Sequence, residues 1–239
     1  MSTAYTADQY VDNYPRGIER QFWHVARNAT ILRWLRKAAM DRLRLLEIGC
    51  GTGIVVDYLR AAGVECLGCD IASPDVPQRL AGIVFPGTDF RTLPLTLRSS
   101  VEGALLFDVI EHVADPVAFL RGLRNSLPAL KRVMITVPAR DELWSPWDDH
   151  FGHFRRYDRV GLCRELTAAN FRSIGSRYFF QTLYLPIWLA KKKRGTAIQA
   201  PTPALALLHR IIGRAMTLEQ AVIPGALPGS SIIAVAEPN

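Results

Sequence analysis

A polar block from Trp144 to Tyr157 carries the side chains best suited to acid–base chemistry. It holds two histidines, two adjacent aspartates and two adjacent arginines within fourteen residues. A neutral imidazole can take a proton near neutral pH, so we expect His150 or His153 to act as a general base, with His112 as the third candidate. A structural hydrogen bond is the alternative role for each of them. The residues that we expect to bind a substrate are Trp144, Asp149, Arg155, Arg156 and Tyr157.

The paired arginines of this block, Arg155 and Arg156, have two interpretations. Planar guanidinium groups can clamp a phosphate or a carboxylate of an acidic substrate. An ion pair with Asp148 or Asp149 is an equally good use of the same side chains.

A glycine-rich turn forms the second constellation. Residues 45–53 read Leu-Leu-Glu-Ile-Gly-Cys-Gly-Thr-Gly, an apolar run that leads into three alternating glycines. Glycine permits the backbone conformations of such a turn and lets a ligand approach the main chain. Dinucleotide sites more often show G-x-G-x-x-G, and the Glu47 carboxylate would repel a pyrophosphate. Glu47 can instead orient the turn or meet an ammonium group, which favours S-adenosylmethionine over a dinucleotide.

An aspartate, Asp70, ends the next apolar run, 17 residues after Gly53. A carboxylate placed there can accept hydrogen bonds from both hydroxyls of a ribose. The alternative is a cap for the segment that begins at Ser73–Pro74.

These motifs together resemble the cofactor signature of class I S-adenosylmethionine-dependent methyltransferases. Residues 87–94, Gly-Thr-Asp-Phe-Arg-Thr-Leu-Pro, are similar to the family segment whose aspartate caps the adenine amino group, and residues 107–116 are similar to a motif of the type 11 and type 23 groups. The resemblance implies a Rossmann-like α/β fold with a seven-stranded doubly wound sheet whose last strand is antiparallel. The cofactor-binding residues that we expect from the turn and the resemblance are Glu47, Gly49, Cys50, Gly51, Gly53, Asp70, Ile71, Asp89, Phe90, Phe107 and Asp108.

Two finer resemblances concern the acceptor and a metal. Residues 152–157 resemble the GH-x-RRY block of certain type 23 methyltransferases, including members that sit among cell-envelope and polysaccharide genes. Asp108, Glu111 and His112 have the spacing at which the similar ubiquinone-pathway O-methyltransferases carry divalent-metal ligands. This chain has Asp where that group has Glu, and the Glu–His pair also occurs widely in methyltransferases without a metal. We therefore expect no metal.

The elements that must position these residues alternate as in a parallel sheet covered by helices. The second predicted helix starts after Asp115-Pro116, an N-cap followed by a first-turn proline. Predicted strands are Leu43–Ile48, Val64–Cys69, Gly82–Phe85, Val101–Phe107, Arg132–Val137, Arg172–Leu183 and Ser231–Ala236, and predicted helices are Ile54–Ala62, Pro116–Leu127 and Asp158–Ala169.

We expect one domain with two additions to its core. Residues 1–40 form an N-terminal helical cap that contains an aromatic and basic helix, Ile18–Ala38. Residues 41–183 and 230–239 form the core, and residues 184–229 form an insertion or lid between the last two strands. Lys191–Arg194 follow an apolar stretch in this insertion, which predicts peripheral contact with a membrane. A solvated charge run beside a core-packing helix is the alternative.

Charge is distributed unevenly along the chain. Of the net charge of +7, residues 1–150 contribute 17 basic against 18 acidic residues, while residues 151–239 contribute 12 against 4. This excess favours an acidic or membrane-borne partner for the C-terminal part. Four cysteines, no run of 18 apolar residues and a polar N-terminus predict reduced thiols and a cytoplasmic protein without signal peptide or membrane span.

The sequence therefore predicts a methyltransferase that converts S-adenosylmethionine to S-adenosylhomocysteine. We expect O-methylation of a small molecule, a sugar or a lipid-linked saccharide with a histidine base. One alternative is a nucleic-acid methyltransferase, but the chain lacks an N/D-P-P-Y/F type motif and an appended RNA-binding module. A non-catalytic S-adenosylmethionine-binding protein is the other, and it would need no histidine-rich block.

Overall fold

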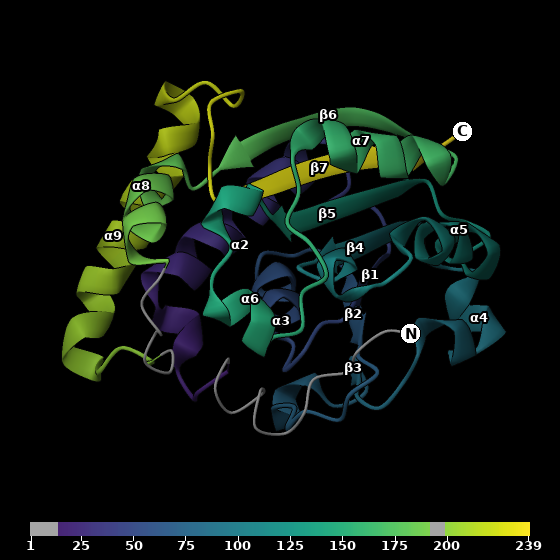
Figure 1. Ribbon diagram of the computed structural model, residues 1–239. Coiled ribbons are helices and arrows are strands. Elements are labelled where there is room, and N and C mark those ends of the chain that lie inside the picture. The colour runs from purple at the N-terminus through teal and green to yellow at the C-terminus, as the bar shows by residue number, and fades with distance from the viewer. Residues whose placement is uncertain (1–13, 192–198) are drawn as a thin grey trace.

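The computed structural model describes residues 14–191 and 199–239. Its centre is a seven-stranded sheet in the order β3-β2-β1-β4-β5-β7-β6 (Figure 1). Strands β1 to β5 pair in parallel, and β7 runs antiparallel to both of its neighbours. This arrangement confirms the predicted fold class. The strands are β1 Leu45–Ile48, β2 Cys66–Cys69, β3 Val84–Phe85, β4 Gly103–Phe107, β5 Arg132–Pro138, β6 Phe171–Phe179 and β7 Ser231–Pro238.

Helices cover both faces of this sheet (Figure 1). The helices are α2 Phe22–Lys37, α3 Ile54–Ala61, α4 Leu95–Arg98, α5 Pro116–Ser126, α6 Pro146–His150, α7 Arg159–Ala168, α8 Gln181–Ala190 and α9 Pro203–Val222, with short 3-10 turns η1 Ile18–Arg20, η2 Gln78–Leu80, η3 Phe90–Thr92, η4 Ile110–His112 and η5 Asp141–Leu143. Side chains alternate between the faces along a strand. In β1, Leu46 packs into the core beneath α5 and α7, whereas Leu45 packs into the core beneath α2 and α3. The central strands are therefore apolar on both sides.

Local capping explains where several helices begin. Asp115 accepts a hydrogen bond from the backbone of Ala118, and Pro116 occupies the first turn of α5, as the sequence predicted. The predicted N-terminal helix is divided in two. Gln21 adopts an extended conformation after the turn η1, and its side chain caps α2 by accepting from the backbone of Trp23.

The sixth strand is shorter than the apolar pattern predicts. Strand β6 ends at Phe179, so the prediction of a strand through Leu183 is wrong at its C-terminal end. Phe180 turns the chain with a φ of 58°. The carboxylate of Glu219 in α9 then accepts hydrogen bonds from the backbone N–H groups of Gln181 and Thr182. These bonds satisfy donors at the start of α8 and favour a helix there.

Two helices, α8 and α9, fill most of the segment between β6 and β7. Helix α9 packs along α2 (Figure 1). The contact is close, because a Cβ on Gly213 would lie 2.7 Å from the carbonyl oxygen of Phe22. Of the predicted basic run, Lys192 to Arg194 lie outside the described residues. Within residues 14–191 and 199–239, no helix has the length and apolarity needed to cross a membrane.

The four cysteines are free thiols. Cys50, Cys66 and Cys69 are buried, and Cys163 is half-buried. Burial raises the pKa of the Cys50 and Cys66 thiols well above the usual range, which disfavours the reactive thiolate.

Candidate functional site

A cleft opens where β1, β2, β4 and β5 end. Its volume is about 570 Å³, within the range of sites that enclose a small ligand. Ligands of doubly wound sheets bind at this edge, beyond the carboxyl ends of the strands. Of the residues predicted from the sequence, those that line the cleft are Gly49, Gly51, Asp70, Ile71, Asp89, Phe90, Phe107, Asp108, His112, His153 and Arg156.

The glycine turn forms one wall of the cleft. Gly49 and Gly51 have φ angles of 75° and 54°, which L side chains rarely adopt. A Cβ on Gly49 would also lie 2.8 Å from a methyl group of Val109. Glycine at these positions therefore keeps the turn close to the neighbouring loop and exposes its backbone to the cleft.

The carboxylate of Asp70 is buried beside this turn. One of its oxygens accepts a hydrogen bond of 2.8 Å from the backbone of Gly51, and the other accepts one of 2.9 Å from the backbone of Ala72. Each carboxylate oxygen can accept a further hydrogen bond. Asp70 is thus fixed against the turn and retains acceptor capacity toward the cleft.

Asp89 and Asp108 line the cleft, and each of them is paired with an arginine. Asp89 caps η3 and forms an ion pair with Arg91; the hydrogen bond from the Arg91 side chain lowers the pKa of the Asp89 carboxyl. Asp108 follows β4 with a φ of 58° and pairs with Arg27 of α2 at 2.5 Å. The pair joins the N-terminal helix to the end of β4.

Glu47, Cys50 and Gly53 belong to the same strand and turn but do not line the cleft. Burial raises the pKa of the Glu47 carboxyl to about 8, although the charge of Arg27 opposes the shift. One oxygen of Glu47 has no hydrogen-bond partner among the described residues. Burial thus disfavours the charged form of Glu47 in the ligand-free protein, and its predicted contact with an ammonium group stays a prediction.

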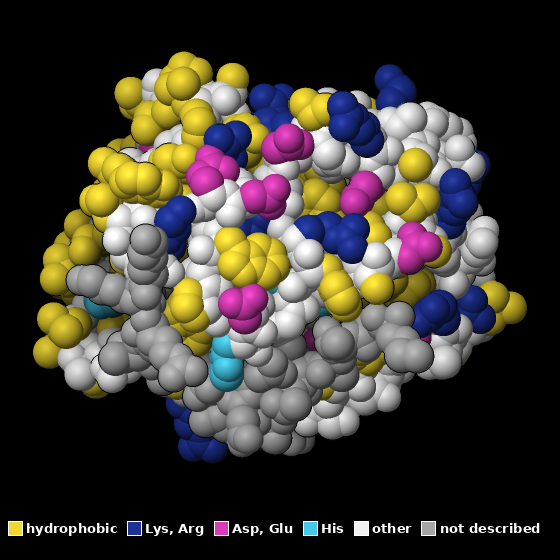
Figure 2. All heavy atoms as spheres, in the orientation of Figure 1, with side chains coloured by type: hydrophobic (Ala, Val, Ile, Leu, Met, Phe, Trp, Pro, Cys, Tyr) yellow, Lys and Arg dark blue, Asp and Glu magenta, His cyan; other side chains and the backbone are white. Residues whose placement is uncertain are grey.

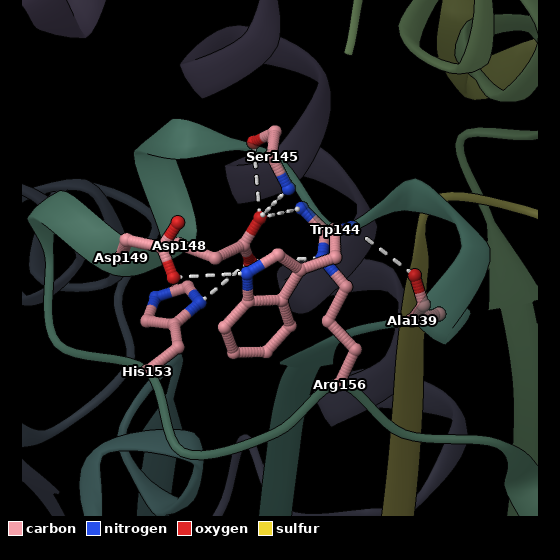
Figure 3. A network of polar contacts seen from close by, with 7 residues as sticks. All are labelled: Ala139, Trp144, Ser145, Asp148, Asp149, His153 and Arg156. Atoms are coloured by element: carbon pink, nitrogen blue, oxygen red, sulfur yellow. Dashed lines mark hydrogen bonds and ion pairs between the residues drawn. The ribbon is translucent and has the colours of Figure 1, made fainter. Parts of the chain in front are cut away.

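A network of polar contacts surrounds Asp148 (Figure 3), and two of its members, His153 and Arg156, line the cleft. Asp148 is buried and accepts hydrogen bonds from Ser145, from the guanidinium of Arg156 and, at 2.8 Å, from Nδ1 of His153. Burial would raise the pKa of this carboxyl, but the bonds from His153 and Arg156 hold it well below its usual range. The ionised carboxylate favours the His153 tautomer with a proton on Nδ1, which leaves Nε2 able to accept a proton.

His112 and Glu111 line the cleft next to His153. The rings of His112 and His153 are 4.6 Å apart, edge to face, and burial lowers the pKa of His112 to about 4. Glu111 is fully buried, which raises its pKa well above the usual value, and neither carboxylate oxygen has a hydrogen-bond partner among the described residues. Glu111, His112 and His153 offer ligand atoms within 4.8 Å of one another. This trio includes His153 instead of Asp108, the residue suggested by the sequence spacing.

Other residues predicted for catalysis or substrate binding point elsewhere. His150 is exposed at the end of α6 and packs against the rings of Trp147 and Phe151, outside the cleft lining. Four further predicted residues do not line the cleft and instead form hydrogen bonds or ion pairs within the chain. Trp144 donates to Asp149, Arg155 binds the carbonyl of Ala114 and the carboxylate of Glu165, and Tyr157 donates to Glu165. Of the block from Trp144 to Tyr157, the structure therefore places Phe151, His153 and Arg156 at the cleft, and of the residues predicted to act there only His153 and Arg156.

A known family of methyltransferase domains matches residues 20–174. The match covers more than half of the chain and contains the glycine turn, Asp70 and His153. The chain belongs to this methyltransferase domain family. With its seven-stranded sheet and antiparallel β7, it is a class I methyltransferase that uses S-adenosylmethionine as methyl donor.

Individual relatives of this methyltransferase match it less completely. Ubiquinone biosynthesis O-methyltransferase from Ruegeria pomeroyi is 33% identical over 91 residues, which are 36% of this chain and 37% of that protein. The chain thus aligns with little more than a third of this curated relative. The crystal structure of magnesium protoporphyrin IX methyltransferase from Synechocystis with bound SAH has 14% identity and a TM-score of 0.52, and covers 100% of this chain and 90% of its own. That of 1,6-didemethyltoxoflavin-N1-methyltransferase from Burkholderia thailandensis has 16% identity and a TM-score of 0.52, with 90% and 78% covered. At these identities the structural likeness shows the fold alone.

Sequence reasoning missed several residues at the methyltransferase cleft. Arg27 and Trp23 reach it from α2, and Ile187 reaches it from α8. The aromatic and basic character of the N-terminal helix was a signal for the first two, but the pairing of Arg27 with Asp108 spans 81 residues of sequence. For Ile187 the only signal in the sequence was its place in the predicted insertion or lid, residues 184–229.

Proposed function

We propose that this methyltransferase transfers the methyl group to a hydroxyl oxygen, with His153 as the general base. The observation that carries the proposal is the 2.8 Å hydrogen bond between His153 Nδ1 and the buried Asp148 carboxylate at the wall of the cleft. A carboxylate that orients an imidazole is a recurring device for proton removal from a hydroxyl.

The reaction needs positioning and one proton transfer. The acceptor oxygen attacks the methyl carbon in line, the bond from carbon to sulfur breaks, and the sulfonium becomes the neutral thioether S-adenosylhomocysteine. The hydroxyl proton passes to Nε2 of His153. Asp148 stabilises the resulting imidazolium, and its ionised state is maintained by Arg156.

His153 is better suited to this role than the other two candidates. Burial lowers the pKa of His112 to about 4, so that imidazole is a weak base at neutral pH. His150 does not line the cleft. The neutral ring of His112 instead packs edge to face against the ring of His153. This contact favours a fixed orientation of the His153 imidazole.

The glycine turn and the acids that follow it provide the cofactor side in this proposal. Asp70 would accept hydrogen bonds from the ribose hydroxyls, and Asp89 would meet the adenine amino group. The backbone of Gly49 and Gly51 would lie against the methionine part. All four of these residues line the cleft, which supports the assignment, and the scheme requires no metal ion.

The acceptor that this cleft favours is neutral and partly apolar. Trp23, Phe119, Phe151 and Ile187 give the cleft apolar walls. The arginines among its described lining residues, Arg27, Arg91 and Arg156, are each paired with a carboxylate. These pairings argue against a phosphate clamp and in favour of a hydroxylated small molecule, a sugar or a lipid-linked saccharide. The similarity to ubiquinone biosynthesis O-methyltransferase from Ruegeria pomeroyi supports oxygen as the acceptor atom.

Methyl-labelled S-adenosylmethionine tests this function. The purified protein is incubated with the labelled donor and fractionated extracts, and the labelled product is analysed by NMR. We expect a methoxy carbon in a small molecule or lipid and an equal amount of S-adenosylhomocysteine. A label found only on nitrogen, on carbon or in nucleic acid would contradict the proposal.

A further inference from the structure

Helix α8 turns an apolar surface to the outside. Leu185, Trp188 and Leu189 are exposed, and no residue of this helix is fully buried. The helix is anchored, because Tyr184 donates a hydrogen bond to the Glu142 carboxylate, and Lys191, which lies over the Trp188 ring, donates one to the Glu142 carbonyl. The exposed side chains therefore belong to a helix held in a defined orientation.

Helix α9 continues this surface. Gly213 and Gln220 face α2, and Gln220 donates a hydrogen bond to Thr30. On the opposite side, at spacings of three and four residues that place side chains on one face of a helix, lie Leu208, Ile211, Ala215, Leu218 and Val222, all exposed. Val222 is 80% exposed. Figure 2 shows hydrophobic side chains gathered over α8 and α9.

Basic residues accompany this surface, and acidic residues are nearly absent from the same segment. In the described residues of this segment, 181–191 and 199–229, the basic residues are Lys191, Arg210 and Arg214, and the one acid is Glu219. Glu219 is buried and caps α8. Arg210 and Arg214 are exposed beside the apolar stripe of α9. An amphipathic surface with cationic flanks has the chemistry that binds an anionic lipid interface.

Helix α8 also borders the cleft. Ile187 of α8 lines the cavity that also contains His153 and Asp70, while its neighbour Trp188 is exposed. The exposed face of α8 and the apolar wall of the cleft are thus carried by adjacent residues.

We propose that the outward faces of α8 and α9 dock this methyltransferase onto an anionic membrane surface, from which its acceptor enters the cleft. The acceptor part of this inference rests on the proposed function, and the docking part does not. Leu185, Trp188, Leu189, Leu208, Ile211, Leu218 and Val222 enter the lipid interface, and Arg210 and Arg214 contact lipid headgroups.

A second copy of the chain is the competing occupant of this surface. In a two-fold symmetric dimer the same patch meets itself, which would bring Arg210 and Arg214 near their own copies without an exposed acid of this segment to compensate. The charge of the patch therefore favours anionic lipid.

Vesicle flotation tests the docking without any donor or acceptor. The full chain is mixed with vesicles of phosphatidylcholine alone or of phosphatidylcholine with phosphatidylglycerol. We expect binding to the anionic vesicles that weakens as salt is added. Leu189→Ser with Leu208→Ser should reduce this binding about tenfold or more through lost apolar burial, and Arg210→Gln with Arg214→Gln should do so through lost attraction to the headgroups.

Matched variants remove similar groups from other surfaces. Leu95→Ser with Val160→Ser replaces exposed apolar residues of α4 and α7, and Arg124→Gln with Arg164→Gln removes two exposed cations of α5 and α7. These controls should bind vesicles within about twofold of the parent. S-adenosylhomocysteine binding, measured by calorimetry, confirms that every variant is folded.

Failure to bind anionic vesicles would overturn the proposal, as would equal losses in the patch variants and the controls. A dimer in sedimentation equilibrium that the leucine variants dissociate, without vesicle binding, would assign the surface to a second copy. Because flotation involves no methyl transfer, its outcome is independent of whether an O-methylated product is found.

Discussion

Replacing His153 with asparagine separates its chemistry from its structural role. In the parent, Nδ1 donates to Asp148 at 2.8 Å, while Nε2 is the proposed proton acceptor. The amide nitrogen of asparagine can take the place of Nδ1 and donate to the same carboxylate, but it offers no base. The loss of stability should therefore be small, about 1 kcal/mol or less. Loss of a general base should lower kcat by about 10²- to 10⁴-fold.

The assay compares three quantities in the parent and in His153→Asn. Calorimetry should give the same affinity for S-adenosylhomocysteine, thermal unfolding should give nearly the same midpoint, and turnover with the identified acceptor should fall. His150→Asn, at an exposed site outside the cleft lining, is the matched control and should keep the parent rate. A His153→Asn enzyme within threefold of the parent would refute the reasoning.

Three further changes test the cofactor side and the interior. Asp70→Asn removes a charged acceptor beside the glycine turn and should weaken S-adenosylhomocysteine binding roughly tenfold to hundredfold, corresponding to about 1.5–3 kcal/mol in calorimetry; unchanged affinity would remove Asp70 from the ribose site. Arg27→Met leaves Asp108 without its cation and should lower the free energy of unfolding by about 1–3 kcal/mol in urea, whereas adding Asp108→Asn should restore part of it; additive losses would argue against coupling. The pKa of the Glu47 carboxyl rises from 4.5 to about 8 on folding, so the folded state retains a proton that the unfolded chain releases, and stability of the ligand-free protein should fall as pH rises through that window. Glu47→Gln should flatten this dependence and gain at most roughly 5 kcal/mol at pH 8, and an unaltered pH profile in urea titrations would show that Glu47 is not the group responsible.

Local sequence patterns were sufficient to predict most strands of the sheet. Parallel strands buried on both faces read as apolar runs, and the helix after Asp115-Pro116 carries its own start signal. The glycine turn could also be predicted from the sequence, because its positive φ values at Gly49 and Gly51 require a residue type, glycine, that is visible in the sequence. The seven-stranded order with an antiparallel β7, expected from the family resemblance, is confirmed.

Contacts between distant segments were not accessible from the sequence. The boundary between β6 and α8 depends on Glu219, which follows Gln181 by 38 residues and caps the helix. An apolar run alone does not distinguish a strand from a helix. The sequence also did not show which histidine of the block from Trp144 to Tyr157 reaches the cleft. In the structure His153 binds Asp148 at the cleft, whereas His150 at the end of α6 is exposed. The roles proposed for these residues stay predictions.

The position of β7 has a consequence for biosynthesis. This strand follows both of its neighbours in the chain, yet it lies between β5 and β6 in the sheet. During translation β6 emerges before β7 and has no strand of its own sheet to pair with. The free edge of β5 is available at the same time, and unpaired edges template aggregation. The last strand of this sheet to be synthesised therefore closes it, so nascent chains stalled before Ser231 should depend strongly on chaperones.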